Sequence, residues 1–260
     1  MNPNPKACIA LVTEKPLEVC KDHYLLKINI KQNYSAPGQF VNIKIGDLEP
    51  LLRRPFSIYN QNSNTIEIIF RIVGKGTKLL KDIKAQSLLD VIGPLGHGFS
   101  IAENKSVLLI GGGVGNAPLY YLARTLNTGN NKIHYIYAAR SKEFIFNKND
   151  FKAIADMFYL YTDNGSEGQK GTAGDAAAAI LQQNKFDIIY TCGPSVMMKA
   201  IAGIAKQSDT PIEASLENYF GCGIGLCFGC AVETISGIKR ACVDGPVFDG
   251  RIVNWDSLLK

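Results

Sequence analysis

The sequence predicts a β-barrel domain, then a parallel α/β domain, then a small C-terminal region that carries clustered cysteines. Three observations predict this. Short β-rich runs separated by turns fill the chain before residue 100, strand-like and helical runs alternate from residue 104, and four cysteines gather after residue 220. A chain of 260 residues can hold two medium domains and a small module. We predict domain limits of 1–102, 103–210 and 211–260.

The first region has β-rich runs at regular intervals. They are Ala7–Val12, Tyr24–Ile30, Gln39–Ile45, Thr65–Val73 and Leu88–Ile92. Turn-forming residues such as Ala36-Pro37-Gly38 separate these runs. Short strands at this spacing are typical of an antiparallel barrel or sandwich.

The second region alternates between the two kinds of secondary structure. Ser106–Ile110 is a short apolar strand, and a helical pattern follows from Ala117 to Leu126. Strand-like runs at 132–139, 157–162 and 186–191 alternate with helical runs at 173–183 and 195–206. This alternation predicts a parallel sheet covered by helices.

The four clustered cysteines have the spacing Cys222-x4-Cys227-x2-Cys230-x11-Cys242. This is the plant-type spacing of ligands to a [2Fe–2S] cluster. Glycines between the first three cysteines let the backbone take positive φ and wrap closely around a cluster. Because such a cluster carries one electron at a time, the spacing indicates an electron-transfer protein.

Two other uses of four cysteines fit less well. Structural zinc sites usually have two C-x2-C pairs, whereas this chain has one. A disulfide framework is typical of secreted proteins, but the opening Met1-Asn2-Pro3-Asn4-Pro5-Lys6 lacks an apolar stretch and a cleavage site. We therefore expect a cytoplasmic protein, with Cys8, Cys20 and Cys192 reduced.

Composition argues against two classes of partner. The formal net charge is +5, and no basic block interrupts the chain, so nucleic acid is not an expected partner. No apolar run approaches the ~20 residues that cross a bilayer, so we expect no membrane span.

Three segments offer sites for phosphate or flavin. The glycine-rich segment Gly111–Gly115 joins a strand to a helix. Backbone amides and the helix terminus there favour an anion. Asn116 and the following strand depart from the glycine-rich fingerprint of dinucleotide-binding folds. In Arg53–Ile58, an arginine beside a proline-stiffened turn can hold a pyrophosphate, and Ser57 can bond a flavin nitrogen. Gly74–Thr77 offers free amides at the start of another helix.

Together these motifs resemble the ferredoxin–NADP reductase superfamily. Arg54-Pro55-Phe56-Ser57-Ile58, Gly74-Lys75-Gly76-Thr77 and Gly93-Pro94-Leu95-Gly96 are similar to its FAD domain, and Gly111–Gly115 with Thr191–Met198 to its pyridine-nucleotide domain. The cysteine loop after Glu217-Asn218-Tyr219 narrows the resemblance to the electron-transfer subunits of class 1B dihydroorotate dehydrogenases. The resemblance covers essentially the whole chain and implies a ferredoxin reductase-like fold with a small C-terminal [2Fe–2S] subdomain.

The resemblance implies a cofactor for each group of residues and no catalytic side chain. FAD is assigned to Arg54, Pro55, Phe56, Ser57, Ile69, Phe70, Arg71, Gly76 and Thr77. NAD is assigned to Gly111, Gly112, Gly113, Val114, Gly115, Cys192 and Gly193. The [2Fe–2S] cluster is assigned to Cys222, Cys227, Cys230 and Cys242.

The resemblance also implies a partner and a direction of electron flow. An FMN-containing catalytic subunit oxidises dihydroorotate, and electrons pass through the cluster and FAD to NAD+ in an assembly with two copies of each chain. Some of the apolar residues Phe220, Ile224, Leu226 and Phe228 are expected to pack under the cluster. We predict the partner contact at Ile224, Leu226 and Phe228.

Two alternatives remain open from the sequence. Similar flavin and [2Fe–2S] subunits serve bifurcating NADH-dependent ferredoxin–NADP reductases, sulfide dehydrogenases and sulfhydrogenases. A different class is a zinc-binding interaction module without redox activity. The sequence does not decide between NAD and NADP.

Overall fold

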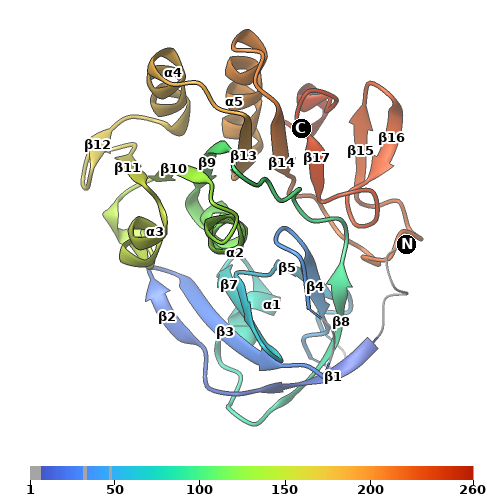
Figure 1. The fold of residues 1–260 in the computed structure, drawn as a ribbon. Coiled ribbons are helices and arrows are strands. Elements are labelled where there is room, and N and C mark those ends of the chain that lie inside the picture. The colour runs from blue at the N-terminus through green and yellow to red at the C-terminus, as the bar shows by residue number, and fades with distance from the viewer. Residues whose placement is uncertain (1–6, 32–33, 47–48, 260) are drawn as a thin grey trace.

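The computed structural model describes residues 7–31, 34–46 and 49–259. The opening hexapeptide that carries the prediction about secretion lies outside the described residues. Figure 1 shows an antiparallel barrel below a parallel sheet with helices on both faces, and a C-terminal hairpin beside them.

The barrel sheet is antiparallel, and eight of its strands lie in the part of the chain that the structure describes. They are β1 (Ala7–Val12), β2 (Leu17–Cys20), β3 (His23–Asn29), β4 (Phe40–Ile43), β5 (Arg54–Ser57), β6 (Asn60–Asn62), β7 (Thr65–Arg71) and β8 (Leu88–Leu95). The short helix α1 (Lys75–Lys81) follows β7. Apolar side chains from alternate strand positions, including Leu26, Ile28 and Ile68, fill the interior without any exposure to solvent.

One bent segment closes the barrel. The strand order runs β5-β4-β8-β1-β3-β7-β6, with β2 also paired to β3. The two ends of this order, β5 and β6, are separated in the chain only by Ile58 and Tyr59. The segment therefore pairs with β4 through its first half and with β7 through its second half. This closure confirms the predicted barrel.

Within the described residues, the nucleotide-domain sheet has seven strands in the order β12-β11-β10-β9-β13-β14-β17. Of these described strands, only β17 runs antiparallel to its neighbour. The strands are β9 (Ser106–Gly112), β10 (Lys132–Ala139), β11 (Met157–Thr162), β12 (Gln169–Lys170), β13 (Ile188–Cys192), β14 (Ile212–Ser215) and β17 (Val247–Asp249). This arrangement confirms the predicted α/β domain.

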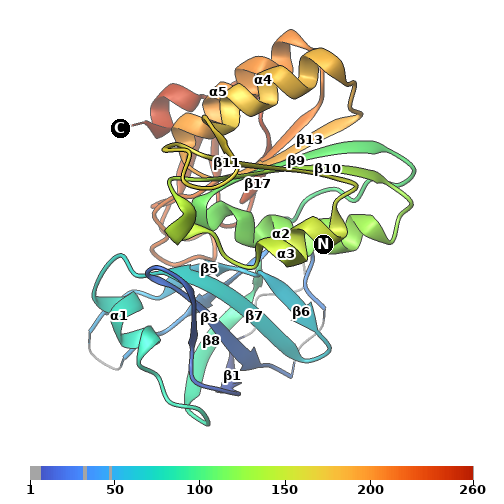
Figure 2. The same ribbon diagram turned by 90° about the vertical axis from the view of Figure 1, so that its left-hand side faces the viewer.

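Helices cover both faces of this sheet. They are α2 (Asn116–Asn127), α3 (Lys148–Ile154), α4 (Ala173–Gln183) and α5 (Ser195–Gln207), with 3-10 turns η1 (Gly113–Gly115), η2 (Lys142–Phe144) and η3 (Trp255–Leu258). Figure 2 shows α2 and α3 between the sheet and the barrel and α4 and α5 on the far face. The α2 and α3 layer is therefore where the two domains meet.

Aromatic and amide side chains fix this meeting of the domains. Tyr59 of the barrel stacks on Tyr120 of α2, with ring centroids 4.6 Å apart. Asn147 donates to the Tyr59 hydroxyl at 3.1 Å, and the Tyr121 hydroxyl donates to the carbonyl oxygen of Ser35 at 2.7 Å. These contacts hold the barrel at one orientation under the sheet.

The C-terminal region is divided between the sheet and a separate hairpin. The hairpin consists of β15 (Ala231–Thr234) and β16 (Gly237–Arg240), and an irregular segment from 216 to 230 leads into it. Because β14 and β17 pair within the nucleotide-domain sheet, that sheet extends beyond residue 210. The domain limits themselves stay a prediction.

One predicted turn is wrong. The sequence predicts a proline-stiffened turn at Arg53–Ile58, but Arg54–Ser57 forms strand β5. Proline is tolerated there because β5 lies at an end of the hydrogen-bonded strand order, where a missing N–H breaks no ladder.

Candidate functional site

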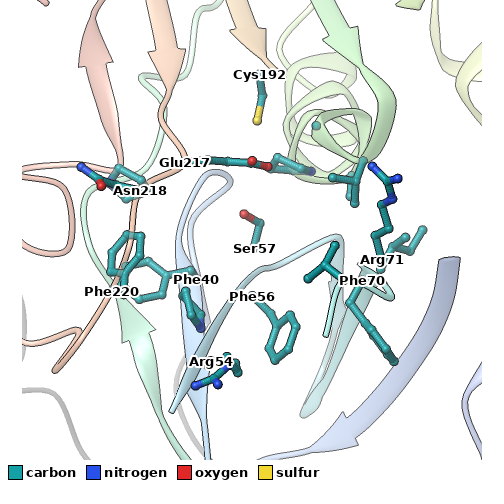
Figure 3. Close-up of a pocket in the computed structure, with 18 of the residues that line it drawn as sticks. Phe40, Arg54, Phe56, Ser57, Phe70, Arg71, Cys192, Glu217, Asn218 and Phe220 are labelled. Atoms are coloured by element: carbon teal, nitrogen blue, oxygen red, sulfur yellow. The ribbon is translucent and has the colours of Figure 1, made fainter. Parts of the chain in front are cut away.

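A cavity of about 410 Å³ lies where the barrel, the α/β domain and the C-terminal segment meet. Its size falls in the range of small-molecule and cofactor sites, roughly 300–1,000 Å³. The lining residues are Phe40, Arg54, Pro55, Phe56, Ser57, Ile69, Phe70, Arg71, Val73, Thr77, Val114, Gly115, Ala117, Pro118, Cys192, Leu216, Glu217, Asn218, Phe220 and Pro246 (Figure 3).

Strand β5 places the flavin motif along this cavity. Arg54, Pro55, Phe56 and Ser57 all line it. Phe56 packs edge-on against Phe70 of β7, with ring centroids 5.8 Å apart. The barrel closure therefore brings both predicted flavin-contacting strands to one wall.

The side chains of Arg53 and Arg54 point to different places, that of Arg53 to Asp90 and that of Arg54 to the cavity. Arg53 forms an ion pair with Asp90 at 2.6 Å and donates to its carbonyl oxygen at 2.9 Å. Arg54 lines the cavity and donates to the carbonyl oxygen of Leu52 at 2.6 Å, without a carboxylate partner among the described residues. Because no described carboxylate neutralises its charge, Arg54 is favoured over Arg53 as the partner of a pyrophosphate.

The turn before α1 supports Arg54. The Thr77 hydroxyl accepts from the backbone N–H groups of Val73 and Gly74 at 2.9 and 3.2 Å, which closes the turn. A Cβ on Gly76 would lie 3.4 Å from Arg54 Nε, so glycine lets the helix approach the guanidinium closely. Thr77 lines the cavity, and Gly76 lies behind Arg54.

The residues of the glycine-rich segment Gly111–Gly115 differ in whether they line the cavity or pack against neighbouring backbone. Only Val114 and Gly115 of the five residues line the cavity. A Cβ on Gly115 would collide with the backbone of Cys192 and Gly193, whereas Gly113, at φ +56°, faces open space. Gly115 thus permits close packing of the α2 start on β13, while the space beside Gly113 is open.

Asn116 explains the departure from the dinucleotide fingerprint. Its side chain is fully buried and donates to the carbonyl oxygens of Gly113 at 2.9 Å and Ala138 at 3.3 Å. The Tyr135 hydroxyl donates to its Oδ1 at 3.2 Å. A side chain at Gly111 would collide with Asn116, so this asparagine takes the place of close glycine packing between strand and helix.

Three polar side chains converge from three elements at the centre of the cavity. Figure 3 shows Ser57 of β5, Cys192 at the end of β13 and Glu217 pointing into the same space. Burial raises the pKa of the Cys192 thiol, and the Glu217 carboxylate raises it further. Glu217 is reached by water from the cavity, yet the surrounding protein desolvates it and raises its pKa. Both shifts favour the protonated forms of the Cys192 thiol and the Glu217 carboxyl in the cavity.

The cysteine loop turns its backbone amides toward the sulfurs. Cys222 Sγ accepts from the N–H groups of Ile224 at 3.4 Å, Leu226 at 3.2 Å and Cys227 at 3.4 Å. Cys227 Sγ accepts from Cys222 and Gly229 at 3.3 and 3.4 Å. Burial acts to raise the pKa of Cys222, but these amides outweigh it and lower the pKa to about 7. The loop thus favours the thiolate that a metal ligand requires.

The four sulfurs form two pairs. Cys222 and Cys227 exchange amide–sulfur bonds near the surface, whereas Cys230 and Cys242 are each 2% exposed, with the Cys242 N–H donating to Cys230 Sγ at 3.4 Å. Two thiolates for each of two irons is the arrangement that a four-cysteine [2Fe–2S] cluster needs. The two pairs of thiols therefore fit the cluster. Among the described residues, no group of three His, Cys, Asp or Glu side chains is placed to hold a metal ion.

Two family models match this chain. Residues 217–254 match the iron-sulfur cluster binding domain of dihydroorotate dehydrogenase B. Residues 109–203 match the oxidoreductase NAD-binding domain. The first match spans all four cysteines, and the second spans the glycine-rich segment and Cys192.

Curated relatives resemble the chain over most of its length. A dihydroorotate dehydrogenase B (NAD(+)) electron transfer subunit of Fusobacterium nucleatum is 39% identical over 247 residues, which cover 90% of this chain and 94% of that protein. The subunit of the same name from Bacillus mycoides is 39% identical over 89% of this chain and 92% of that protein. The chain belongs to the family of dihydroorotate dehydrogenase B electron transfer subunits. This confirms the family that the cysteine loop and the flavin motif predict, together with its cofactors FAD, [2Fe–2S] and NAD.

Solved structures agree with the fold of an electron transfer subunit of this family. A chain of the NADH-dependent reduced ferredoxin-NADP oxidoreductase, described for flavin-based electron bifurcation, superposes with a TM-score of 0.87. It is 34% identical, and the match covers 100% of this chain and 93% of that one. The ferredoxin reductase of carbazole 1,9a-dioxygenase matches with a TM-score of 0.71 at 20% identity, over 82% of this chain and 70% of that one, and supports the fold alone.

In the part of the chain that the structure describes, no helix is both long enough and apolar enough to cross a bilayer.

Sequence reasoning missed several cavity residues, among them Phe40, Glu217 and Phe220. Glu217 and Phe220 belong to the irregular segment before the cluster, and Phe40 belongs to β4. No local pattern marks them, because their place follows from long-range packing. The predicted residues Gly111, Gly112, Gly113 and Gly193 lie near the cavity without lining it, so their contact with NAD stays a proposal.

Replacing Cys227 by serine should remove or distort the [2Fe–2S] absorption and the paramagnetic signal of the reduced cluster, while FAD stays bound. The reason is that Cys227 lies on the cluster loop and not on the flavin wall. Cys8→Ser, in barrel strand β1, is the matched control and should keep a full cluster. An unaltered cluster in Cys227→Ser would remove this cysteine from the ligand set.

Arg54→Ala should weaken FAD binding by about ten-fold or more, because each charge-assisted hydrogen bond contributes ~1.5–3 kcal/mol and a factor of ten is ~1.4 kcal/mol. The flavin content of the purified protein and its dissociation constant measure this. Arg53→Ala is the control and should bind FAD normally, since Arg53 is paired with Asp90. The opposite ranking of the two variants would show that Arg53 holds the pyrophosphate.

Glu217→Gln should raise the melting temperature at pH 8 but not at pH 4. A carboxyl whose pKa is raised by folding destabilises the native state once the pH exceeds its unfolded value of about 4.3. The neutral amide removes this loss. The exposed Glu103 supplies the control Glu103→Gln, with little change at either pH. An equal effect of Glu217→Gln at both pH values would contradict a raised pKa.

Proposed function

We propose that this chain is the electron-transfer subunit of an NAD-dependent dihydroorotate dehydrogenase in pyrimidine biosynthesis. A partner catalytic subunit with FMN oxidises dihydroorotate, and this chain passes the electrons through [2Fe–2S] and FAD to NAD+. One observation carries the proposal: a four-cysteine loop for a one-electron cluster borders a flavin-sized cavity in a chain 39% identical to subunits of that name.

The two bound groups have complementary chemistry. A [2Fe–2S] cluster exchanges single electrons, whereas a flavin takes up or gives either single electrons or a hydride. Both kinds of site occur in this chain, which fits a protein that converts between one-electron and hydride transfer.

The side chains around the cavity have different proposed roles in binding the flavin and the nucleotide. Arg54 supplies positive charge for the pyrophosphate, and Phe56 and Phe70 give an apolar wall for the ring system. Val114 and Gly115 lie on the opposite wall, where a nicotinamide could reach the flavin. Glu217 lies on the wall of the same cavity, and desolvation raises its pKa. Together these side chains would orient a flavin between a cluster and a nucleotide.

The exposed side of the cluster loop fits a partner subunit. Leu226 is 76% exposed, Phe228 57% and the neighbouring Tyr219 90%. Phe228 has φ +57°, which is a strained backbone for a bulky residue, and its ring lies over the Arg240 guanidinium at 5.4 Å. Strain that holds an aromatic ring out toward solvent indicates a contact surface.

One predicted contact residue points inward. Ile224 is half-buried against the core that lies between the sheet, α4, α5 and the C-terminal region, as is Phe220. The contact with a catalytic subunit is therefore expected at Leu226 and Phe228, with Tyr219 added. We propose two copies of each chain around a two-fold axis, because closed symmetry is the common outcome for assemblies.

A second function has one observation in its favour. The chain of a NADH-dependent reduced ferredoxin-NADP oxidoreductase matches all of this chain at 34% identity and a TM-score of 0.87. A flavin and [2Fe–2S] subunit of a bifurcating reductase would use the same cavity and loop. Only the partner and its substrate differ.

The partner therefore decides the function. The chain is purified with the dihydroorotate dehydrogenase catalytic subunit from the same genome, and NADH formation is followed after dihydroorotate and NAD+ are added. We expect NADH from the complex and none from either chain alone. Co-purification with a larger flavin and iron–sulfur subunit, without activity toward dihydroorotate, would instead establish the bifurcating function. A colourless protein that contains zinc would overturn both.

Leu226→Asp should weaken the complex by about ten-fold or more, the ~1.4 kcal/mol or more expected when a central apolar contact receives a charge. FAD content and NADH oxidation by the isolated chain should stay unchanged, since Leu226 is exposed. Leu17→Asp, at a 63% exposed barrel position, is the control. Equal affinities of the two variants for the catalytic subunit would place the interface elsewhere.

A further inference from the structure

Asn42 is a buried amide that joins the barrel to the cysteine loop. It lies in β4 and has no exposure to solvent. Its Nδ2 donates to the carbonyl oxygen of Cys222, the first cluster ligand, at 3.2 Å. The two residues are 180 positions apart in the chain, so this bond links the barrel to the C-terminal region directly.

The other side-chain atom of this amide lacks a protein partner. Asn42 Oδ1 is buried and accepts no hydrogen bond from the described residues. An unsatisfied buried acceptor destabilises a fold, whereas an apolar side chain of the same shape would not. We therefore infer that the hydrogen bond from Asn42 to the carbonyl oxygen of Cys222 has a function that offsets this cost.

The position of Asn42 in the sheet places this hydrogen bond beside the flavin motif. In the ladder, Asn42 is directly opposite Pro55 of β5, within the flavin motif. Phe40, two residues earlier and on the same face of β4, packs against Phe220 with ring centroids 5.0 Å apart. Strand β4 thus touches the flavin wall through its backbone and the cluster loop through its side chains.

The loop is shaped to receive this amide. Gly223 follows the first ligand at φ +73°, and a Cβ there would collide with the Asn42 side chain. Glycine is required both for the left-handed backbone and for the close approach. Asn42 and Gly223 are therefore fitted to each other.

We propose that Asn42 is a positioning residue for electron transfer, which holds the Cys222 side of the cluster at a fixed place beside the flavin strand. This inference rests on the proposed cofactors but not on the identity of the partner or its substrate. NADH serves as the donor in the test. Its hydride reduces FAD, and one of those two electrons then reduces one ferric iron of the cluster to ferrous.

The first experiment replaces Asn42 by leucine, which has a similar shape and no donor. The purified chain with FAD and cluster is mixed anaerobically with NADH, and cluster bleaching is followed against flavin bleaching. We expect cluster reduction to slow about five-fold, the factor that one typical hydrogen bond represents. Flavin reduction by NADH should be unchanged, and the paramagnetic spectrum of the reduced cluster should shift.

Asn60→Leu is the matched control. Asn60 is also a buried asparagine of the barrel, and it bonds Glu67 and Arg124 instead of the cluster loop. It should leave the spectrum of the cluster and the rate of its reduction unchanged.

A second pair of variants approaches the contact from the loop. Gly223→Ala should collide with Asn42 and reproduce the slowed cluster reduction. Gly237→Ala is the control, because Gly237 also has a positive φ of +100° but faces open space at the start of β16. The same defect in Gly223→Ala and Asn42→Leu, with both controls normal, supports the inference.

Each other outcome has one meaning. Loss of the cluster with FAD retained in Asn42→Leu also supports the inference, because the loop alone is then disordered. Unchanged cluster spectra and reduction rates in Asn42→Leu and Gly223→Ala overturn it, and so does joint loss of FAD and cluster, which would make Asn42 a general folding residue. Wild-type protein without a cluster that NADH reduces would refute the proposed function instead.

Discussion

The packing of barrel strand β4 against the cysteine loop is the constraint on which the rest of the arrangement depends. A flavin and a cluster can exchange electrons only if both lie close together within the same folded unit. The loop from 216 to 230 has little regular structure, so contacts outside it must hold it. Phe40 and Asn42 supply two of these. His97 holds the neighbouring segment of the fourth cysteine, with its Nδ1 donating to the carbonyl oxygen of Val243 at 2.6 Å. Because β4 also pairs with the flavin strand, one element sets both positions.

Much of the fold could be predicted because its signals are local. The runs at Ala7–Val12, Lys132–Ala139 and Ala173–Gln183 have the same bounds in the structure, since alternation and helical periodicity are visible within a few residues. The cysteine spacing is equally local. Strands β14 and β17 were missed because their pairing joins distant segments. Glu217 was missed because its raised pKa comes from the cavity around it and not from its neighbours in sequence.

The chain contains sites for the two ends of an electron path, one that exchanges hydride with a nicotinamide nucleotide and one that exchanges single electrons. This explains why a dihydroorotate dehydrogenase subunit and a bifurcating reductase subunit can share 34–39% identity with it over nearly its whole length. We propose that the difference between their functions lies on the surface beside Cys227, where the exposed side chains of Leu226 and Phe228 would meet another protein. Specificity for the substrate would then be a property of the assembly.

The central claim is that a flavin and a [2Fe–2S] cluster share this chain and are in electronic contact. Anaerobic titration of the purified chain with NADH, followed by visible absorption and electron paramagnetic resonance, tests it most directly. We predict that three electrons are taken up per chain, two by FAD and one by the cluster, with the signal of a reduced [2Fe–2S] centre. Uptake of two electrons without that signal would contradict the claim.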